Sequence, residues 1–162
     1  MINVTEFGEL LIPNSRKTIK KSEFSCREDI KSVFMPDGIR VIPMDAFWGC
    51  HNLEKVRLPK DLKAIKEGAF YDCYKLSSLD LPEGLEVIEP IAFSKCFELT
   101  TIRIPDSVRE IGECAFDKCQ KLTHVEVSPH TKIGPLTFHE CPCENEIPQN
   151  RCDSLFDDTK KL

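Results

Sequence analysis

The chain has 162 residues, 41% of them hydrophobic, which is enough to fill the core of one domain. Its 27 acidic and 22 basic residues give a net charge of -5, and the sequence shows no basic cluster, so nucleic acid is excluded as an expected partner. No apolar run approaches the roughly 20 residues that span a bilayer, so we expect no membrane insertion.

A pattern of apolar residues recurs every 23 residues, and a fixed period of this length indicates a repeat protein. A degenerate first copy contains Phe7, Leu10, Ile12, Pro13, Ile19 and Phe24. The first regular copy contains Ile30, Val33, Met35, Pro36, Ile39, Ile42, Ala46, Phe47 and Cys50, and three more copies repeat these positions up to Leu122. The last copy is degenerate again, with Leu122, Val125, Val127, Ile133, Phe138 and Cys141.

Degenerate copies at both ends are typical of solenoid caps. We therefore expect an N-terminal cap over residues 1–29, four regular repeats over 30–122, a C-terminal repeat or cap over 123–148 and a tail over 149–162. Glu144 stands where the next leucine would be, so the solenoid is expected to stop near it. A cap strand around residues 146–148 and a frayed end are the two alternatives for the residues after Glu144.

Each copy predicts the same order of short elements. Segments such as 53–58 alternate apolar and polar side chains in their second half, which indicates a short strand with one buried face, and Pro59 ends it. Segments such as Pro36-Asp37-Gly38 predict a turn. The spacing Ile-x-x-x-Ala-Phe-x-x-Cys then favours a strand fragment followed by a single helical or 3₁₀ turn. Stacked copies would place equivalent strands side by side in a parallel sheet.

The recurring Ile/Leu-Pro and Ala-Phe-x-x-Cys-x-x-Leu pattern closely resembles the BspA-type leucine-rich repeats of bacterial and protist surface proteins, over about residues 7–141. The resemblance implies an α/β-type repeat solenoid. This is a right-handed superhelix with short parallel strands on one face and loops or short helical or 3₁₀ turns on the other. It also implies an extracellular or cell-surface location and adhesion to a host or matrix protein. Residues 1–6 lack an export signal and the chain shows no anchor, so the location stays open.

Five of the nine cysteines occupy one position of successive copies, namely Cys50, Cys73, Cys96, Cys119 and Cys141. Cβ atoms separated by a strand spacing of about 4.8 Å are farther apart than the roughly 3.8 Å of a disulfide. We therefore interpret this column as reduced, buried cysteines that act as small hydrophobes. The parallel column of Phe47, Phe70, Phe93, Phe116 and Phe138 is interpreted as a stacked core spine.

The cysteines near the C-terminus leave three alternatives open. His139, Cys143 and Cys152 are weak candidates for zinc ligands, since zinc accepts nitrogen and sulfur donors, but the Cys-x-Cys spacing is not that of a zinc knuckle. The zinc site is the first alternative. The second is a Cys143–Cys152 disulfide if the protein is exported, and the third is that these cysteines are free thiols. We assign no metal and no cofactor to the chain.

Catalytic motifs are lacking in the sequence. None of the four histidines lies in a nucleophile motif, and no glycine-rich loop could hold a phosphate. We therefore expect no enzymatic activity. The two alternatives to a binding module are a structural spacer within a larger repeat array and, with less support, a zinc or redox site in the C-terminal Cys/His cluster.

The outward-facing strand positions are the candidate binding site. Strand alternation aims two columns of side chains away from the core, Ser32, Lys55, Ser78, Thr101 and His124, and Phe34, Arg57, Asp80, Arg103 and Glu126. Solenoids commonly bind through their concave strand face, although a merely solvated face is the alternative. An aromatic residue such as Phe34 at the end of a mixed-charge row is typical of a binding anchor. The predicted function is protein binding through Phe34, Lys55, Arg57, Asp80, Thr101, Arg103, His124 and Glu126.

Overall fold

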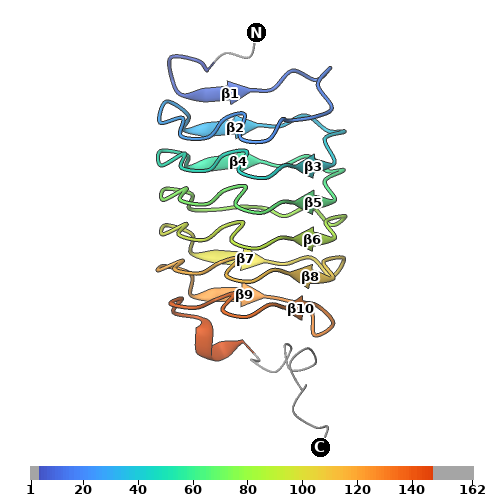
Figure 1. Cartoon of the computed structure of the whole chain (residues 1–162), viewed down its shortest axis with the longest axis vertical. Helices are drawn as coiled ribbons and strands as arrows, with labels where there is room; N and C mark the ends of the chain where they lie inside the picture. Colours follow the sequence, from blue (N-terminus) through green and yellow to red (C-terminus); the bar gives the residue numbers. More distant parts are fainter. Residues whose placement is uncertain (1–3, 148–162) are drawn as a thin grey trace, which may run out of the picture.

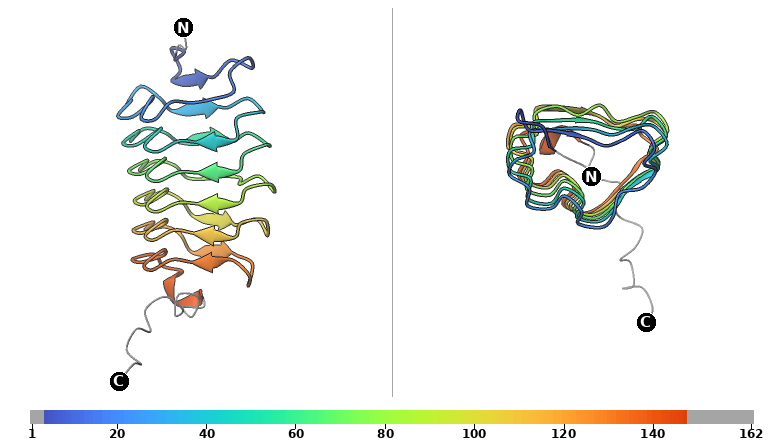
Figure 2. Two further views of the ribbon diagram at one scale, coloured as in Figure 1. Left: turned by 45° about the vertical axis from the view of Figure 1, so that its right-hand side comes forward. Right: turned by 90° about the horizontal axis from the view of Figure 1, so that it is seen from above.

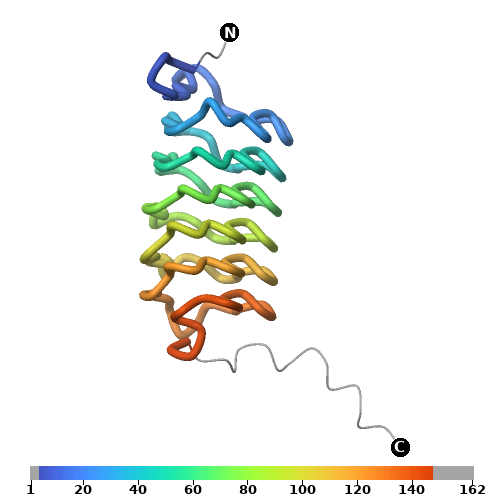
Figure 3. Tube along the Cα trace, turned by 90° about the vertical axis from the view of Figure 1, so that its left-hand side faces the viewer, coloured from blue at the N-terminus to red at the C-terminus, as the bar shows by residue number. Residues whose placement is uncertain are grey.

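The chain winds into a stack of coils in which each 23-residue copy forms one coil (Figure 1). A computed structural model describes residues 4–147. Viewed along the stack, the coils lie almost on top of one another (Figure 2), and the tube view shows the same regular rise from end to end (Figure 3). The predicted leucine-rich-repeat solenoid is therefore confirmed.

Five of the six coils begin with a short strand, and these strands pair in parallel, as predicted, in one three-stranded and one two-stranded sheet. The first three coils contribute β1 (Glu9–Leu11), β2 (Ser32–Phe34) and β4 (Lys55–Arg57), in that order across the sheet. The last two contribute the pair β7 (Thr101–Arg103) and β9 (His124–Glu126). The coil between them keeps only a single bridge, from Lys55 to Ser78, so the predicted strand around residues 78–80 is not formed.

A second parallel sheet runs along another side of the stack. Its strands are β3 (Val41–Ile42), β5 (Ala64–Ile65), β6 (Val87–Ile88), β8 (Glu110–Ile111) and β10 (Lys132–Ile133). They pair in the order of the coils, with Ile42, Ile65, Ile88 and Ile111 in register. These are the strand fragments that the sequence predicted after each turn, and each buries an isoleucine.

The rest of each coil is an irregular wall of turns, so loops replace the helical turns that were the other alternative for this side. Two positions of each coil on this wall have positive φ, one before the core alanine and one before the column cysteine. In the second and fourth coils, for example, Asp45 has φ 55° and Lys95 has φ 62°. Left-handed backbone disfavours side chains with a Cβ, and most strongly β-branched ones, so Ile91 at φ 50° is strained.

The core consists of columns of identical residues. Phe24, Phe47, Phe70, Phe93, Phe116 and Phe138 stack with ring centroids 5.2 to 5.4 Å apart and planes within 16° of parallel. Beside them, each column cysteine donates its thiol hydrogen to the phenylalanine carbonyl oxygen of the preceding coil, at 3.0 to 3.5 Å. Burial raises the pKa of Cys73, which keeps its thiol protonated and able to donate. Both columns therefore lie where the sequence predicted them.

The two ends of the stack are closed differently. Val4 bridges Leu10 in antiparallel fashion and so covers part of the free edge of β1. At the other end, η1 (Glu144–Glu146) is a short 3₁₀ helix followed by the buried Ile147, so the described residues form no cap strand, which was one of the two alternatives for this segment. Residues 4–147 contain no helix that is long and apolar enough to cross a membrane.

The thiol column can be tested by Cys73→Ala, which removes a fully buried side chain and its hydrogen bond to the Phe47 carbonyl. We expect the free energy of unfolding to fall by about 1–2 kcal/mol, because packing and a weak hydrogen bond are lost. Urea denaturation followed by circular dichroism measures this. Cys26→Ala, at an exposed thiol outside the column, is the control and should leave the midpoint unchanged. Equal midpoints for both variants would contradict a structural role of the column.

The strained turn can be tested by Ile91→Asn. Asparagine adopts left-handed backbone far more readily than isoleucine does, so we expect this variant to be more stable by about 1 kcal/mol. Ile91→Ala, which keeps an ordinary Cβ at the same φ, should bring no comparable gain. Thermal unfolding of the three proteins under one condition is the measurement, and a lower melting temperature for Ile91→Asn would show that the side chain outweighs the strain.

Candidate binding surfaces

The predicted binding residues lie in two aligned columns along the side of the stack that carries the sheet of β1, β2 and β4 and, farther along, the β7–β9 pair; we call this side the strand face. Ser32 is in register with Lys55, and Phe34 with Arg57. Farther along the stack, the register places Thr101 beside His124 and Arg103 beside Glu126. All eight candidate residues are exposed, and the residue between each outward pair is buried in the core or packs against it.

A hollow of about 530 Å³ lies on the strand face at its N-terminal end. Its lining includes Phe34, Lys55, Arg57 and Asp80, so the structure brings four of the predicted residues together even though Asp80 is not in a strand. Thr101, Arg103, His124 and Glu126 lie beyond it, toward the C-terminal end of the same face.

Two exposed apolar residues at this hollow were not among the predicted binding residues, and one of them, Phe7, had been assigned to the apolar pattern of the first copy at the position of the buried Ile30. Phe7, 71% exposed, lines the hollow, and Leu11, 51% exposed, is in register with Phe34, itself 42% exposed. Leu11 adjoins the hollow through a second depression that it shares with Phe34 and Arg57. The signal for Leu11 was present in the sequence, because the outward column extended one 23-residue copy back from Phe34 reaches Leu11.

The charged residues of the face differ in whether they already have partners. Arg57 donates to the Met35 carbonyl oxygen at 3.0 Å and lies 3.9 Å from Asp37. Arg103 pairs with Glu83 at 2.5 Å, and this hydrogen bond raises the Arg103 pKa.

By contrast, neither Lys55 nor Asp80 has an ion-pair partner within residues 4–147. These two charges are therefore available to a ligand, and both line the hollow.

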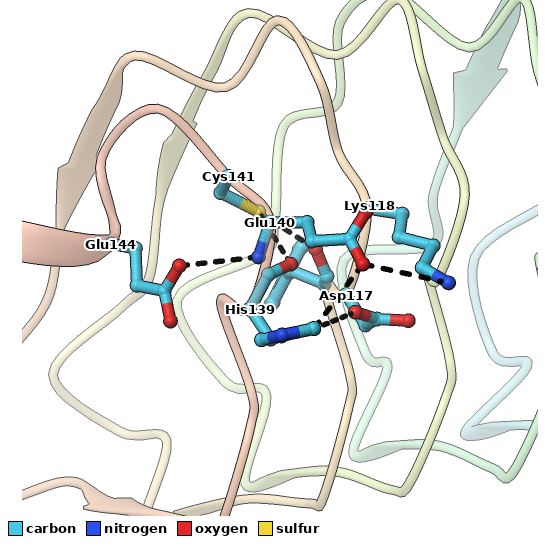
Figure 4. A network of polar contacts seen from close by, with 7 residues as sticks. Asp117, Lys118, His139, Glu140, Cys141 and Glu144 are labelled. Carbon is cyan, nitrogen blue, oxygen red and sulfur yellow. Dashed lines mark hydrogen bonds and ion pairs between the residues drawn. The ribbon is translucent and has the colours of Figure 1, made fainter.

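The C-terminal Cys/His cluster is held by contacts within the chain (Figure 4). The His139 Nδ1 lies 2.9 Å from Asp117 Oδ1, and Glu140 lies 3.7 Å from Lys118. Cys143 is 1% exposed, and its contact with Cys141, together with burial, raises its pKa. Cys152, the third weak zinc candidate, lies outside the described residues. Within residues 4–147, no group of three or more histidine, cysteine and acidic side chains is placed to hold a metal ion.

Two short aromatic ladders on the irregular wall were also missed. Trp48 stacks on Tyr71 with centroids 4.0 Å apart, and His51, Tyr74 and Phe97 stack at 4.6 and 4.9 Å. These side chains are half-buried and lie outside the phenylalanine spine. The signal was present in the sequence, because the aromatics occupy the positions just after the spine phenylalanine and just after the column cysteine.

Comparison with known proteins agrees with this architecture. Residues 17–145, well over half of the chain, match the family profile described as "BspA type Leucine rich repeat region", in six copies. No curated protein matched the chain. The crystal structure of a T. pallidum leucine-rich repeat protein is similar with a TM-score of 0.71 and 24% identity, over 89% of this chain and 79% of that one. A leucine-rich repeat protein from Bacteroides ovatus ATCC 8483 gives 0.68 and 29%, over 78% of this chain and 39% of that one.

The His139–Asp117 contact predicts a pH dependence of the last coil. The hydrogen bond and charge of Asp117 raise the His139 pKa above its ordinary 6.5, so protonated histidine is favoured in the folded state. Its stabilising effect is fully present below pH 6.5 and is lost as the pH rises through the raised value. We expect an NMR titration of His139 to give a pKa above 6.5, and Asp117→Asn to bring it back toward that value. An unshifted pKa in the parent protein would contradict the contact.

Proposed function

We propose that this chain, which belongs to the BspA-type leucine-rich repeat family, is a non-catalytic module that binds a protein ligand on its strand face. The observation that carries the proposal is the gathering of Phe7, Leu11 and Phe34 at one end of that face, around the hollow. Across residues 4–147, only two other large hydrophobic side chains, Val41 and Leu136, are comparably exposed.

Exposed apolar side chains that cluster are informative because each could have been polar at no cost to the core. Scattered single hydrophobic residues are normal on a protein surface, whereas a cluster rimmed by polar groups is typical of a binding site. Aromatic side chains in such clusters supply much of the binding energy when a partner covers them. Phe34 and Phe7 are therefore the anchors of the proposed interface.

The charged part of the face would select and orient the ligand. Along the outer column the side chains change from Leu11 and Phe34 to Arg57, Asp80, Arg103 and Glu126, an apolar end followed by alternating charges. Rim charges mainly affect the association rate and the choice of partner. The ligand that fits is a protein segment with an apolar end and mixed charges beyond it, and we propose a host-surface or extracellular-matrix protein as its source.

The proposal predicts that Phe34→Ala abolishes ligand capture. Truncation of an aromatic anchor costs about 2 kcal/mol or more, which is roughly a thirtyfold loss of affinity. The measurement is capture of matrix and host-surface proteins by the immobilised chain, followed by the affinity of each captured protein for every variant. The matched control is Val41→Ala, because Val41 is 39% exposed in the same coil but lies on the second sheet.

A ligand that binds the parent and Val41→Ala but not Phe34→Ala supports binding at the strand face. We also expect weaker binding of the ligand when alanine replaces Arg57, Asp80 and Arg103 together. A ligand that is indifferent to Phe34 and to these charges contradicts the proposal. If the chain were a spacer in a larger array, it would instead associate end to end, and light scattering would show assemblies that grow with concentration.

A further inference from the structure

A second, smaller hollow lies on the irregular wall, in a different part of each coil from the strand face. Its volume is about 260 Å³, and its described lining residues are Ser22, Ser25, Cys26, Asp45 and Trp48. The first three belong to the first coil and the last two to the second. The described lining therefore contains one carboxylate, one indole ring and no cation.

In the neighbouring coils, a similar pair of an aromatic ring and a carboxylate already contacts a lysine ammonium group. Trp48 stacks on one face of Tyr71, and the Lys95 ammonium lies 4.7 Å from the centroid of the same ring. Because Trp48 covers one face of Tyr71, Lys95 must cover the other. The ammonium is also 3.5 Å from Asp72 Oδ1, so the chain already holds one lysine between an aromatic face and a carboxylate.

The opposite end of this ladder is open. Ser25 occupies the position in the first coil that Trp48 occupies in the second and Tyr71 in the third, so no ring continues the ladder there. The small side chains of Ser25 and Cys26 leave the hollow in front of Trp48. The free side of the indole is thus accessible to a ligand, in the way that the far side of Tyr71 is accessible to Lys95.

Asp45 supplies the negative charge of the hollow. Within residues 4–147 its carboxylate makes no hydrogen bond or ion pair. A Cβ placed on Gly68 would lie 2.7 Å from Asp45 Oδ1 and 3.0 Å from Trp48 Cε3, so both side chains lie against the third coil at Gly68, and both also line the hollow on the side of the first coil. Glycine at position 68 therefore leaves room for this pair.

We propose that this hollow binds an alkylammonium group, such as the end of a lysine side chain or a quaternary amine. A cation over an aromatic face is attracted by the ring quadrupole, and tryptophan is the strongest of the aromatic partners. The unpaired carboxylate adds a charge interaction, and the net charge of -5 attracts cations to the protein as a whole. The volume is below that of a site for a drug-sized ligand and suits one small head group.

Trp48 makes the test direct, because it is the only tryptophan of the chain and its fluorescence reports on the hollow. The probes are tetramethylammonium chloride and Nα-acetyl-lysine amide, titrated at constant ionic strength. Their uncharged counterparts are tert-butanol and Nα-acetyl-norleucine amide. We expect a saturable change with a Kd on the order of 1 mM for an ammonium probe and none for the uncharged compounds. Tighter binding of one ammonium probe identifies which of the two sources the site prefers.

Two variants separate binding from folding. Asp45→Asn tolerates the left-handed backbone and removes the charge, so the Kd should rise about tenfold. Ser25→Phe should extend the ladder onto Trp48 and fill the hollow, which abolishes the response while the melting temperature is kept. Glu113→Gln, at an exposed carboxylate outside the hollow, is the control and should bind like the parent.

Three results would overturn the proposal. The first is an equal response to charged and uncharged probes, and the second is unchanged binding in Asp45→Asn or in Ser25→Phe. The third is no saturable signal up to about 50 mM of either ammonium probe, since a site weaker than this would contribute less than about 2 kcal/mol.

Discussion

The contact between each coil and the next is the interaction on which the whole structure depends. A single coil of 23 residues cannot bury its apolar side chains alone, so the stability is a sum over the interfaces between neighbours. The phenylalanine column shows the geometry of these interfaces, with ring centroids 5.2 to 5.4 Å apart, close to the separation of paired strands. The hydrogen bond from each column thiol to a carbonyl oxygen of the preceding coil adds a polar contact that recurs with the same period. Side chains at core positions must therefore match their neighbours above and below.

This constraint also explains where the surface chemistry lies. Positions that face the core repeat because they stack, whereas outward positions are free to differ from coil to coil. Their side chains still form columns, because the coils are in register. Along such a column the polarity and charge of the surface therefore change from one coil to the next. On the strand face the column changes from Leu11 and Phe34 to charged residues. On the irregular wall it changes from Ser25 to Trp48 and Tyr71, with Lys95 covering the far side of the tyrosine.

The two proposed surfaces differ in how the backbone supports them. The strand face rests on paired strands and on a core-facing residue between each outward pair, so its side chains are held at regular spacing. The irregular wall depends on two left-handed residues per coil, which turn the chain sharply and aim residues such as Asp45 toward the ring column. Part of the strain in these turns is relieved where glycine is present, as at Gly68, and part of it remains, as at Ile91.

The sequence by itself determined the period, the order of elements in each coil, the core columns and the alternation that points Phe34 and Arg57 outward. These features derive from a repeat that every regular copy obeys. Only the tertiary structure decided how surface residues of different coils combine. It left Phe7 exposed at the hollow that Phe34 lines, brought His139 within hydrogen-bonding distance of Asp117, and placed Asp45 and Trp48 at one smaller hollow. The physical reason is that core positions are constrained by stacking and so leave a periodic signal in the sequence. Surface positions vary from coil to coil, and the sites that they form can be recognised only when the structure shows which of their side chains are in contact.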